Sequence, residues 1–152
     1  MKVVRLLEYG CQLVFEDLTT PTIARDEILV KVKSTTVNHV DLVKASGAVR
    51  QILPIELPWI PGHEFSGVVE QIGSDVTAYA PGDAVFGATS GMGAYAEDLA
   101  VKAAVIARKP ANLSFEEAAS APVAAQTAWE GIFTHGHPKR DKRSWSMPAP
   151  EP

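Results

Sequence analysis

The most informative segment of the chain reads Pro61-Gly62-His63-Glu64-Phe65-Ser66-Gly67-Val68-Val69-Glu70-Gln71-Ile72-Gly73. It opens with a Pro-Gly turn dipeptide and continues into β-branched residues, which favour a pleated, half-buried strand. We therefore expect His63 and Glu64 to lie where a loop enters a strand, with their side chains on opposite faces. An imidazole and a carboxylate at such a position could bind a metal or transfer a proton. They could equally be a solvated loop pair.

Size and composition limit the possible classes of protein. The chain has 152 residues, which suggests one domain with a real core. Its net charge of -4 gives no electrostatic footprint for nucleic acid or an anionic membrane. The single cysteine, Cys11, excludes an internal disulfide and a multi-cysteine zinc site. No apolar run approaches the roughly 20 residues of a membrane span, and charge interrupts the N-terminus too early for a signal peptide. We therefore expect a cytoplasmic protein.

Short apolar segments separated by Gly and Pro turns dominate the first hundred or so residues. Besides the segment after His63, they predict strands over residues 2–8, 13–18, 27–37, 84–86, 94–101 and 105–108. In the third of these, Ile28, Val30 and Val32 are set against Glu27, Lys31 and Lys33 with a period of two, which predicts one solvent-exposed face. Residues 42–45 could form one helical turn, and the prolines of residues 51–60 predict an extended loop. Many short strands of this kind indicate a small barrel or sandwich.

The pattern changes after residue 113. Ser114 and Glu117 have the spacing of a capping box, which predicts a helix start. Pro122 suits the first turn of a second helix over residues 123–133. Residues 136–152 contain prolines, charges and isolated apolar residues without a period, which predicts a disordered tail.

One segment matches a phosphate-binding pattern in its letters only. Gly91-Met92-Gly93-Ala94-Tyr95-Ala96 fits G-x-G-x-x-A, but a dinucleotide loop needs a helix after it and an acid about 20 residues further on. That position holds Ala111, and the segment that follows the glycines favours a strand. We interpret this segment as a hairpin with a flexible tip.

Five motifs, in this order, resemble the N-terminal, GroES-like catalytic domain of the medium-chain dehydrogenase/reductase superfamily. They are Asn38-His39-Val40-Asp41, Pro61 to Val69, Pro81-Gly82-Asp83-Ala84-Val85, Gly93-Ala94-Tyr95-Ala96-Glu97 and Ala124-Ala125-Gln126-Thr127-Ala128-Trp129. The resemblance covers about residues 1–134. It implies a mainly β fold with short helices, in which residues 1–121 form a GroES-like, partly open β-barrel. Residues 122–135 would begin a linker helix to a Rossmann domain, and residues 136–152 lie outside the family pattern.

Within this superfamily, the local chemistry favours the zinc-less branch. Asn38 occupies the position of the first cysteine ligand of the zinc enzymes, and an amide is a poor zinc ligand. The cysteine-rich lobe of a structural zinc site is also missing, since Cys11 is the only thiol. The chain thus resembles the quinone oxidoreductase-like members, which implies that NADPH reduces a quinone or an enone and that no metal takes part.

The resemblance also implies roles for individual residues. Asn38 would lie near the nicotinamide and the substrate carbonyl, as both a catalytic and a cofactor-binding residue whose amide donates to developing oxyanion charge. Thr127 would contact the nicotinamide, although its hydroxyl could instead bond back to the preceding helical turn. Tyr95 is a second candidate proton donor, although a tyrosine in a barrel strand is more often a core residue. Asp41 and His63 would form a supporting pair, with Glu64 also structural.

The sequence leaves alternatives open. No strand or glycine-rich dinucleotide loop follows residue 135, so we expect a truncated or altered chain that is inactive alone. A second hypothesis is a non-catalytic barrel that binds a partner, or another copy, through the exposed helix 123–133 and the basic tail. A third is a residual zinc protein that uses His39, His63 and Glu64, although strand alternation would make these side chains converge poorly.

Overall fold

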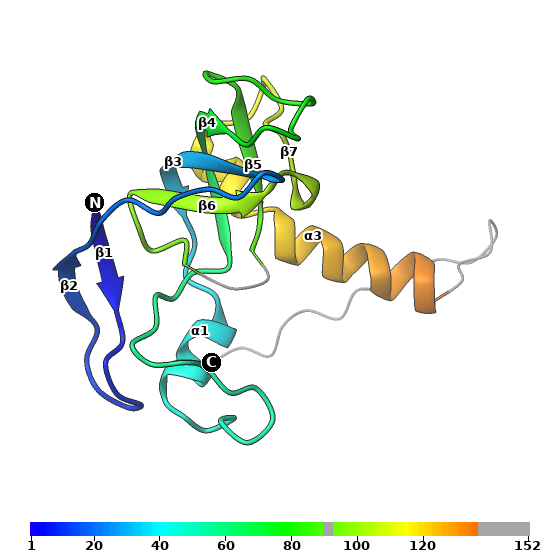
Figure 1. Cartoon of the computed structure of the whole chain (residues 1–152). Coiled ribbons are helices and arrows are strands. Elements are labelled where there is room, and N and C mark those ends of the chain that lie inside the picture. Colours follow the sequence, from blue (N-terminus) through cyan, green and yellow to red (C-terminus); the bar gives the residue numbers. More distant parts are fainter. Residues whose placement is uncertain (90–92, 137–152) are drawn as a thin grey trace.

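Two antiparallel sheets form the framework of the molecule, which the computed structural model describes over residues 1–89 and 93–136. In the small sheet, β1 (Lys2–Arg5) pairs with β2 (Val14–Asp17). The large sheet has the strand order β6-β3-β4-β5-β7 (Figure 1). Its strands are β3 (Glu27–Thr35), β4 (Glu64–Ile72), β5 (Ala84–Ala88), β6 (Asp98–Lys102) and β7 (Ile106–Arg108).

The large sheet curls so that its two edges approach each other. The edge strands β6 and β7 are consecutive in the sequence and are separated only by η1 (Ala103–Val105), a short 3-10 helix. Because such a helix rises about 2 Å per residue, η1 can bridge only a narrow gap. The result is a partly open barrel with a few short helices, which confirms the fold class predicted from the sequence.

Apolar side chains of β3, β4, β5 and β6 fill the barrel. Phe65 and Val69 of β4 lie at its centre and are almost fully buried. They pack with Ile28, Val30, Val76, Val85, Ala94, Leu99, Val101 and Ile106. A smaller cluster joins Leu6 to Trp59, which exchange backbone hydrogen bonds across an isolated bridge. This bridge ties the N-terminal hairpin to the loop that precedes Pro61.

The predicted alternation along β3 is wrong in its first half. Ile28, Leu29 and Val30 are all buried, so neither face of β3 is exposed to solvent over these three residues. The pairing of β3 with β4 shifts register between Leu29 and Val30, and a bulge of this kind interrupts the period of two. The predicted strand over residues 94–101 also differs, because regular pairing begins only at Asp98 and Ala96 makes a single bridge to Val3.

Three α-helices complete the described part of the chain. The helix α1 (His39–Ala45) is longer than the single turn that the sequence predicts. The helix α2 (Phe115–Ala119) begins at the expected capping box, in which the Glu117 amide donates to Ser114 Oγ at 3.1 Å and the Ser114 amide donates to Glu117 Oε2 at 2.8 Å. The helix α3 (Pro122–Trp129) continues as the π-helical turn η2 (Glu130–His135).

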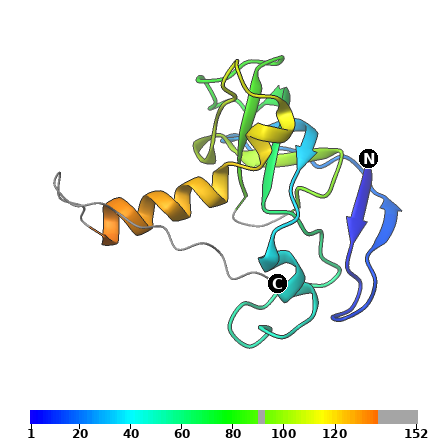
Figure 2. The same cartoon turned by 180° about the vertical axis from the view of Figure 1, so that it is seen from behind.

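Helix α3 extends away from the barrel, as both cartoon views show (Figures 1 and 2). Trp129 is 63% exposed and Phe133 is 51% exposed, and their rings contact each other with centroids 4.4 Å apart. The end of this helix is therefore apolar and open to solvent, as the sequence suggests. The predicted tail over residues 137–152 and the glycine loop at residues 90–92 lie outside the described residues.

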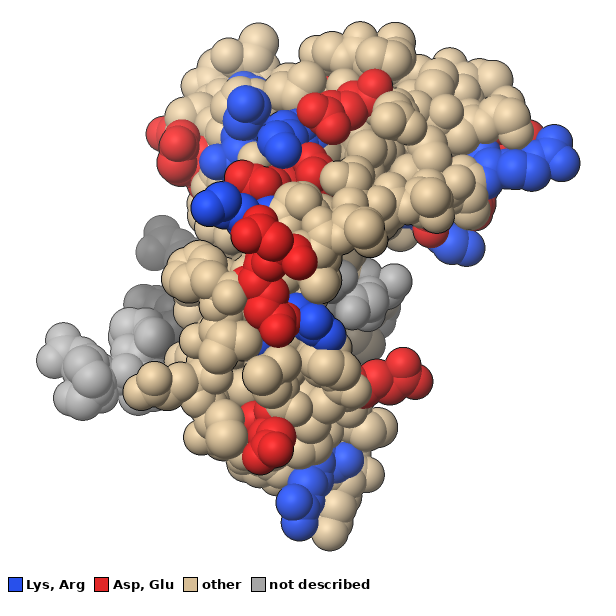
Figure 3. Space-filling view, turned by 60° about the vertical axis from the view of Figure 1, so that its left-hand side comes forward, with Lys and Arg blue, Asp and Glu red and all other residues tan. Residues whose placement is uncertain are grey.

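Charged side chains of both signs share the molecular surface. On the face shown in Figure 3, basic and acidic residues lie close together in mixed groups, and wide uncharged areas lie between these groups. Among the described residues, no helix is long and apolar enough to cross a bilayer.

Candidate functional site

Asp41 is the centre of the site because its buried carboxylate joins three of the motifs. Only 3% of this residue is exposed. Its Oδ2 accepts from the backbone N–H of Asn38 at 2.9 Å and from the Tyr95 hydroxyl at 3.4 Å. Its Oδ1 accepts from the backbone N–H of Gly62 at 3.3 Å. A buried carboxylate needs such donors, and here they come from segments that are distant in the sequence.

Asn38 caps helix α1 and keeps a donor group available. Its Oδ1 accepts from the Val40 amide at 3.2 Å, and Asp41 completes a capping box. This bond fixes which side-chain atom is the oxygen, so the two N–H groups of Nδ2 point elsewhere. Nδ2 has no partner within residues 1–89 and 93–136. The side chain can therefore cap the helix and donate to a ligand oxygen at the same time.

Tyr95 is held as a neutral phenol. Burial, together with the negative charge of Asp41 and the hydrogen bond to it, raises the pKa of Tyr95 to about 12. At neutral pH the hydroxyl is protonated and directed at the carboxylate. A group with this pKa and this partner is a weak acid, so the geometry favours a role in orientation over proton donation.

His63 contacts a different group from the one we expected. Its Nδ1 lies 2.8 Å from the carbonyl oxygen of Thr89. A carbonyl only accepts, so Nδ1 carries the proton and Nε2 is left as an acceptor in the neutral ring. The predicted pairing of Asp41 with His63 is wrong, because Asp41 bonds to Asn38, Gly62 and Tyr95 instead.

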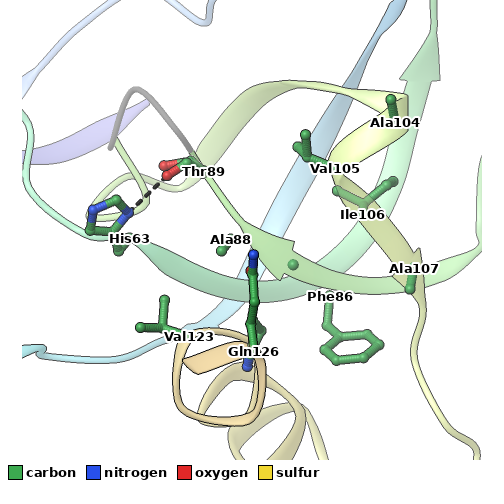
Figure 4. Close-up of a pocket in the computed structure, with 12 residues that line it drawn as sticks. His63, Phe86, Ala88, Thr89, Ala104, Val105, Ile106, Ala107, Val123 and Gln126 are labelled. Atoms are coloured by element: carbon green, nitrogen blue, oxygen red, sulfur yellow. Dashed lines mark hydrogen bonds between the residues drawn. The ribbon is translucent and has the colours of Figure 1, made fainter. Parts of the chain in front are cut away.

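A cleft of about 660 Å³ lies beside His63 (Figure 4). One wall is the end of β5 with Thr89, and the opposite wall is the first turns of α3 with Val123 and Gln126. The remaining lining is largely apolar and includes Phe86, Val105 and Ile106. The buried hydroxyl of Thr89 has no hydrogen-bond partner in the described ranges. The cleft therefore combines an apolar floor with a few polar groups, as small-molecule sites do.

Glu64 is buried, with 4% of the residue exposed, and connects two segments. Its Oε2 accepts from the Thr36 hydroxyl at 2.9 Å, and its Oε1 accepts from the Val123 amide at 2.7 Å. Neither bond is shared with His63. The two neighbours His63 and Glu64 thus have separate partners and do not act as one pair.

The structure brings only some of the expected residues together. Asn38, Asp41 and Tyr95 form one hydrogen-bonded group, but this group does not line the cleft beside His63. Thr127 is exposed on α3 and also lies outside the lining of the cleft. Sequence reasoning missed Thr36, Thr89 and Gln126. Nothing in the local sequence marks these three. Thr36 bonds to Glu64 and the Thr89 carbonyl to His63, both from distant segments, and Gln126 lines the cleft only because α3 lies opposite the end of β5. The spacing of Asn38 and Asp41, by contrast, is that of a capping box and could have predicted the start of α1.

The proposed zinc ligands do not assemble in the part of the chain that the structure describes. No group of three or more His, Cys, Asp or Glu side chains suited to a metal occurs there. His39 is exposed at the start of α1, Glu64 bonds to Thr36 and Val123, and His63 bonds to Thr89.

Known proteins share both the sequence and the fold of this chain. The family model for the alcohol dehydrogenase GroES-like domain matches residues 24–111. The 2-methylene-furan-3-one reductase of Solanum lycopersicum is 36% identical over 147 residues, which cover 90% of this chain and 38% of that protein. The mitochondrial NAD(P)H oxidoreductase RTN4IP1 of Dictyostelium discoideum is 37% identical over 132 residues, or 84% of this chain and 36% of that protein. A zinc-type alcohol dehydrogenase-like protein of Staphylococcus aureus is 39% identical over 129 residues, or 84% and 37%.

Solved structures agree with this assignment. An alcohol dehydrogenase superfamily protein from Novosphingobium aromaticivorans superposes with a TM-score of 0.84 at 32% identity, covering 89% of this chain and 42% of that one. The Escherichia coli quinone oxidoreductase complexed with NADPH gives a TM-score of 0.80 at 30% identity, covering 87% and 40%. The chain spans well under half the length of these relatives. It belongs to the alcohol dehydrogenase GroES-like domain family of the medium-chain dehydrogenase/reductase superfamily.

Proposed function

We propose that this chain is the barrel part of a zinc-less, NADPH-dependent reductase of quinones or enones. The observation that carries the proposal is that Asn38 caps α1 through Oδ1 and keeps its Nδ2 donor available. By the family resemblance, Asn38 takes the place of the first zinc-binding cysteine of the zinc enzymes. An amide donor suits a carbonyl oxygen that gains negative charge, because a fixed N–H group stabilises that charge without reorganisation.

The residues of the barrel position the substrate in this proposal. Asn38 donates to the carbonyl oxygen, and its orientation is fixed by helix α1 and by Asp41. Tyr95 holds the Asp41 carboxylate from the other side and stays protonated. The nicotinamide supplies the reducing hydride when it is bound.

Cofactor binding is a further part of the proposal. Asn38 and Thr127 would contact the nicotinamide, and the exposed position of Thr127 on α3 is compatible with such a contact. Two relatives whose names mention this cofactor are the NAD(P)H oxidoreductase of Dictyostelium discoideum and the Escherichia coli quinone oxidoreductase. The chain covers only 36% of the first protein and 40% of the second. We therefore expect the chain alone to be inactive. Titration of the purified chain with NADPH and NADH, followed by nicotinamide fluorescence, should give no saturable binding at micromolar concentrations.

A hybrid enzyme tests the function directly. Residues 1–135 would replace the matching segment of the Escherichia coli quinone oxidoreductase. NADPH oxidation would be followed with a quinone and with an enone, and NADP⁺ reduction would be followed with a primary alcohol. We expect turnover of a quinone or an enone and none of the alcohol. A hybrid that folds and binds NADPH but reduces neither substrate contradicts the proposal.

A zinc-dependent alcohol dehydrogenase is the second candidate, favoured by relatives that are named zinc-type alcohol dehydrogenase-like proteins. The metal content of the purified chain separates the two candidates. Stoichiometric zinc that is lost in a His63→Ala variant would support the second, and a substoichiometric content equal in both variants would support the first.

A further inference from the structure

The start of helix α3 depends on a group outside the helix. The N-cap residue of α3 is Ala121, which has no side-chain acceptor and makes no capping bond. The first N–H groups of a helix have no partner within it and normally need one. Here the Val123 amide donates to Glu64 Oε1 at 2.7 Å, a bond between residues that are 59 positions apart. The barrel therefore supplies the cap that the helix lacks.

The same carboxylate holds a second segment. Glu64 Oε2 accepts from the Thr36 hydroxyl at 2.9 Å, and the Thr35 hydroxyl donates to the Glu64 carbonyl oxygen at 2.7 Å. Thr36 lies two residues before Asn38, and Val123 lies about one helical turn before Thr127. A single buried side chain thus joins the segment that ends at Asn38 to the helix that carries Thr127.

We propose that Glu64 is a positioning residue, which sets the separation and orientation of the Asn38 segment and helix α3. This inference rests on the proposed function, in which Asn38 and Thr127 contact the same nicotinamide. A carboxylate suits the task because its two oxygens bond in different directions and because negative charge is favoured at a helix N-terminus. An amide at this position could keep one acceptor but would lose the charge and one of the two acceptor oxygens.

Backbone amide exchange measured by NMR tests the bridge in the chain itself. In Glu64→Gln we expect the Val123 amide to exchange about tenfold faster, because a charge-assisted bond is replaced by a weaker one. We expect the side-chain amide signals of Asn38 to shift in the same variant. Glu130→Gln is the matched control, since Glu130 accepts from Gln126 further along the same helix. It should leave both readouts unchanged.

A second variant distinguishes a bridge from a simple helix cap. Thr36→Val removes the donor to Oε2 without touching α3. If Glu64 couples the two segments, Thr36→Val also speeds amide exchange at Val123. The exchange rate in the double variant then differs from the product of the two single effects, because both substitutions break the same bridge. Unchanged exchange at Val123 in either single variant overturns the proposal. None of these readouts needs cofactor or turnover, so their failure is distinguishable from failure of the proposed function.

Discussion

Asn38 combines a structural and a chemical task in one side chain. Its Oδ1 caps α1 through the Val40 amide, while Nδ2 stays available as a donor. The two tasks can be separated by substitution. Serine is a good helix cap, but it has no side-chain amide and its hydroxyl is too short to reach the location of Asn38 Nδ2. Alanine provides neither a cap nor a donor.

The stability of two Asn38 variants tests the capping task. Asn38→Ala should lower the free energy of unfolding by about 1 kcal/mol, because the first turn of α1 loses its cap. Asn38→Ser should lower it by no more than about 0.5 kcal/mol. Urea unfolding followed by circular dichroism measures both values. Equal stability of the alanine variant and the native chain would show that Asn38 does not cap α1.

Tyr95 gives a prediction about pH. Its pKa is raised from 10.0 to about 12, so in the folded chain the phenol keeps its proton where the unfolded chain has lost it. The stabilisation from Tyr95 is therefore complete below pH 10 and is lost as the pH rises towards 12. The difference in absorbance between the native chain and Tyr95→Phe, titrated with base, isolates this group. A difference curve with its midpoint near 10 would contradict the account.

At the scale of elements, the turn into β4 needs a glycine at position 62. Gly62 has a φ of 97°, and a Cβ there would lie 2.5 Å from Cδ1 of Tyr95 and 2.8 Å from its backbone nitrogen. The first of these atoms belongs to a ring whose hydroxyl is held by Asp41. Neither atom can move away easily. A side chain at position 62 would therefore displace the Tyr95 ring and disturb its hydrogen bond to Asp41.

Gly82 provides a matched control for Gly62. Its φ is 96°, but a Cβ there would meet no atom within 4 Å. We expect Gly82→Ala to cost about 1 kcal/mol, since only the backbone conformation is disfavoured. Gly62→Ala should cost at least about 2 kcal/mol more, because it adds a steric clash. Thermal unfolding of both variants compares them, and equal losses would mean that the contact with Tyr95 is not tight.

Elements with local signals could be predicted from the sequence, and long-range contacts could not. Ser114 and Glu117 are three residues apart, and their reciprocal bonds appear as expected. The bond from Val123 to Glu64 spans 59 residues and depends on how α3 meets the barrel. The expected Asp41–His63 pair was wrong for the same reason, because the Pro-Gly turn directs the Gly62 amide, and not the His63 ring, towards Asp41.

At the scale of the whole molecule, helix α3 lies largely outside the core. Phe133 is 51% exposed, whereas Phe65 is fully buried in the barrel. Phe133→Ala should therefore change the free energy of unfolding by less than about 1 kcal/mol, and Phe65→Ala should lower it by about 3–5 kcal/mol. Urea unfolding of the two variants measures this contrast. A large loss in the Phe133 variant would show that η2 packs onto the rest of the chain in solution.

The central claim is that the barrel provides an amide donor for the reduction of a carbonyl compound. The most direct test is the turnover of the hybrid enzyme with Asn38 and with Asn38→Ser in its barrel. We expect kcat for the quinone or enone to fall by about a hundredfold in the serine variant, because one donor to developing oxyanion charge is lost. The variant should stay folded. Equal kcat in the two hybrids would contradict the account.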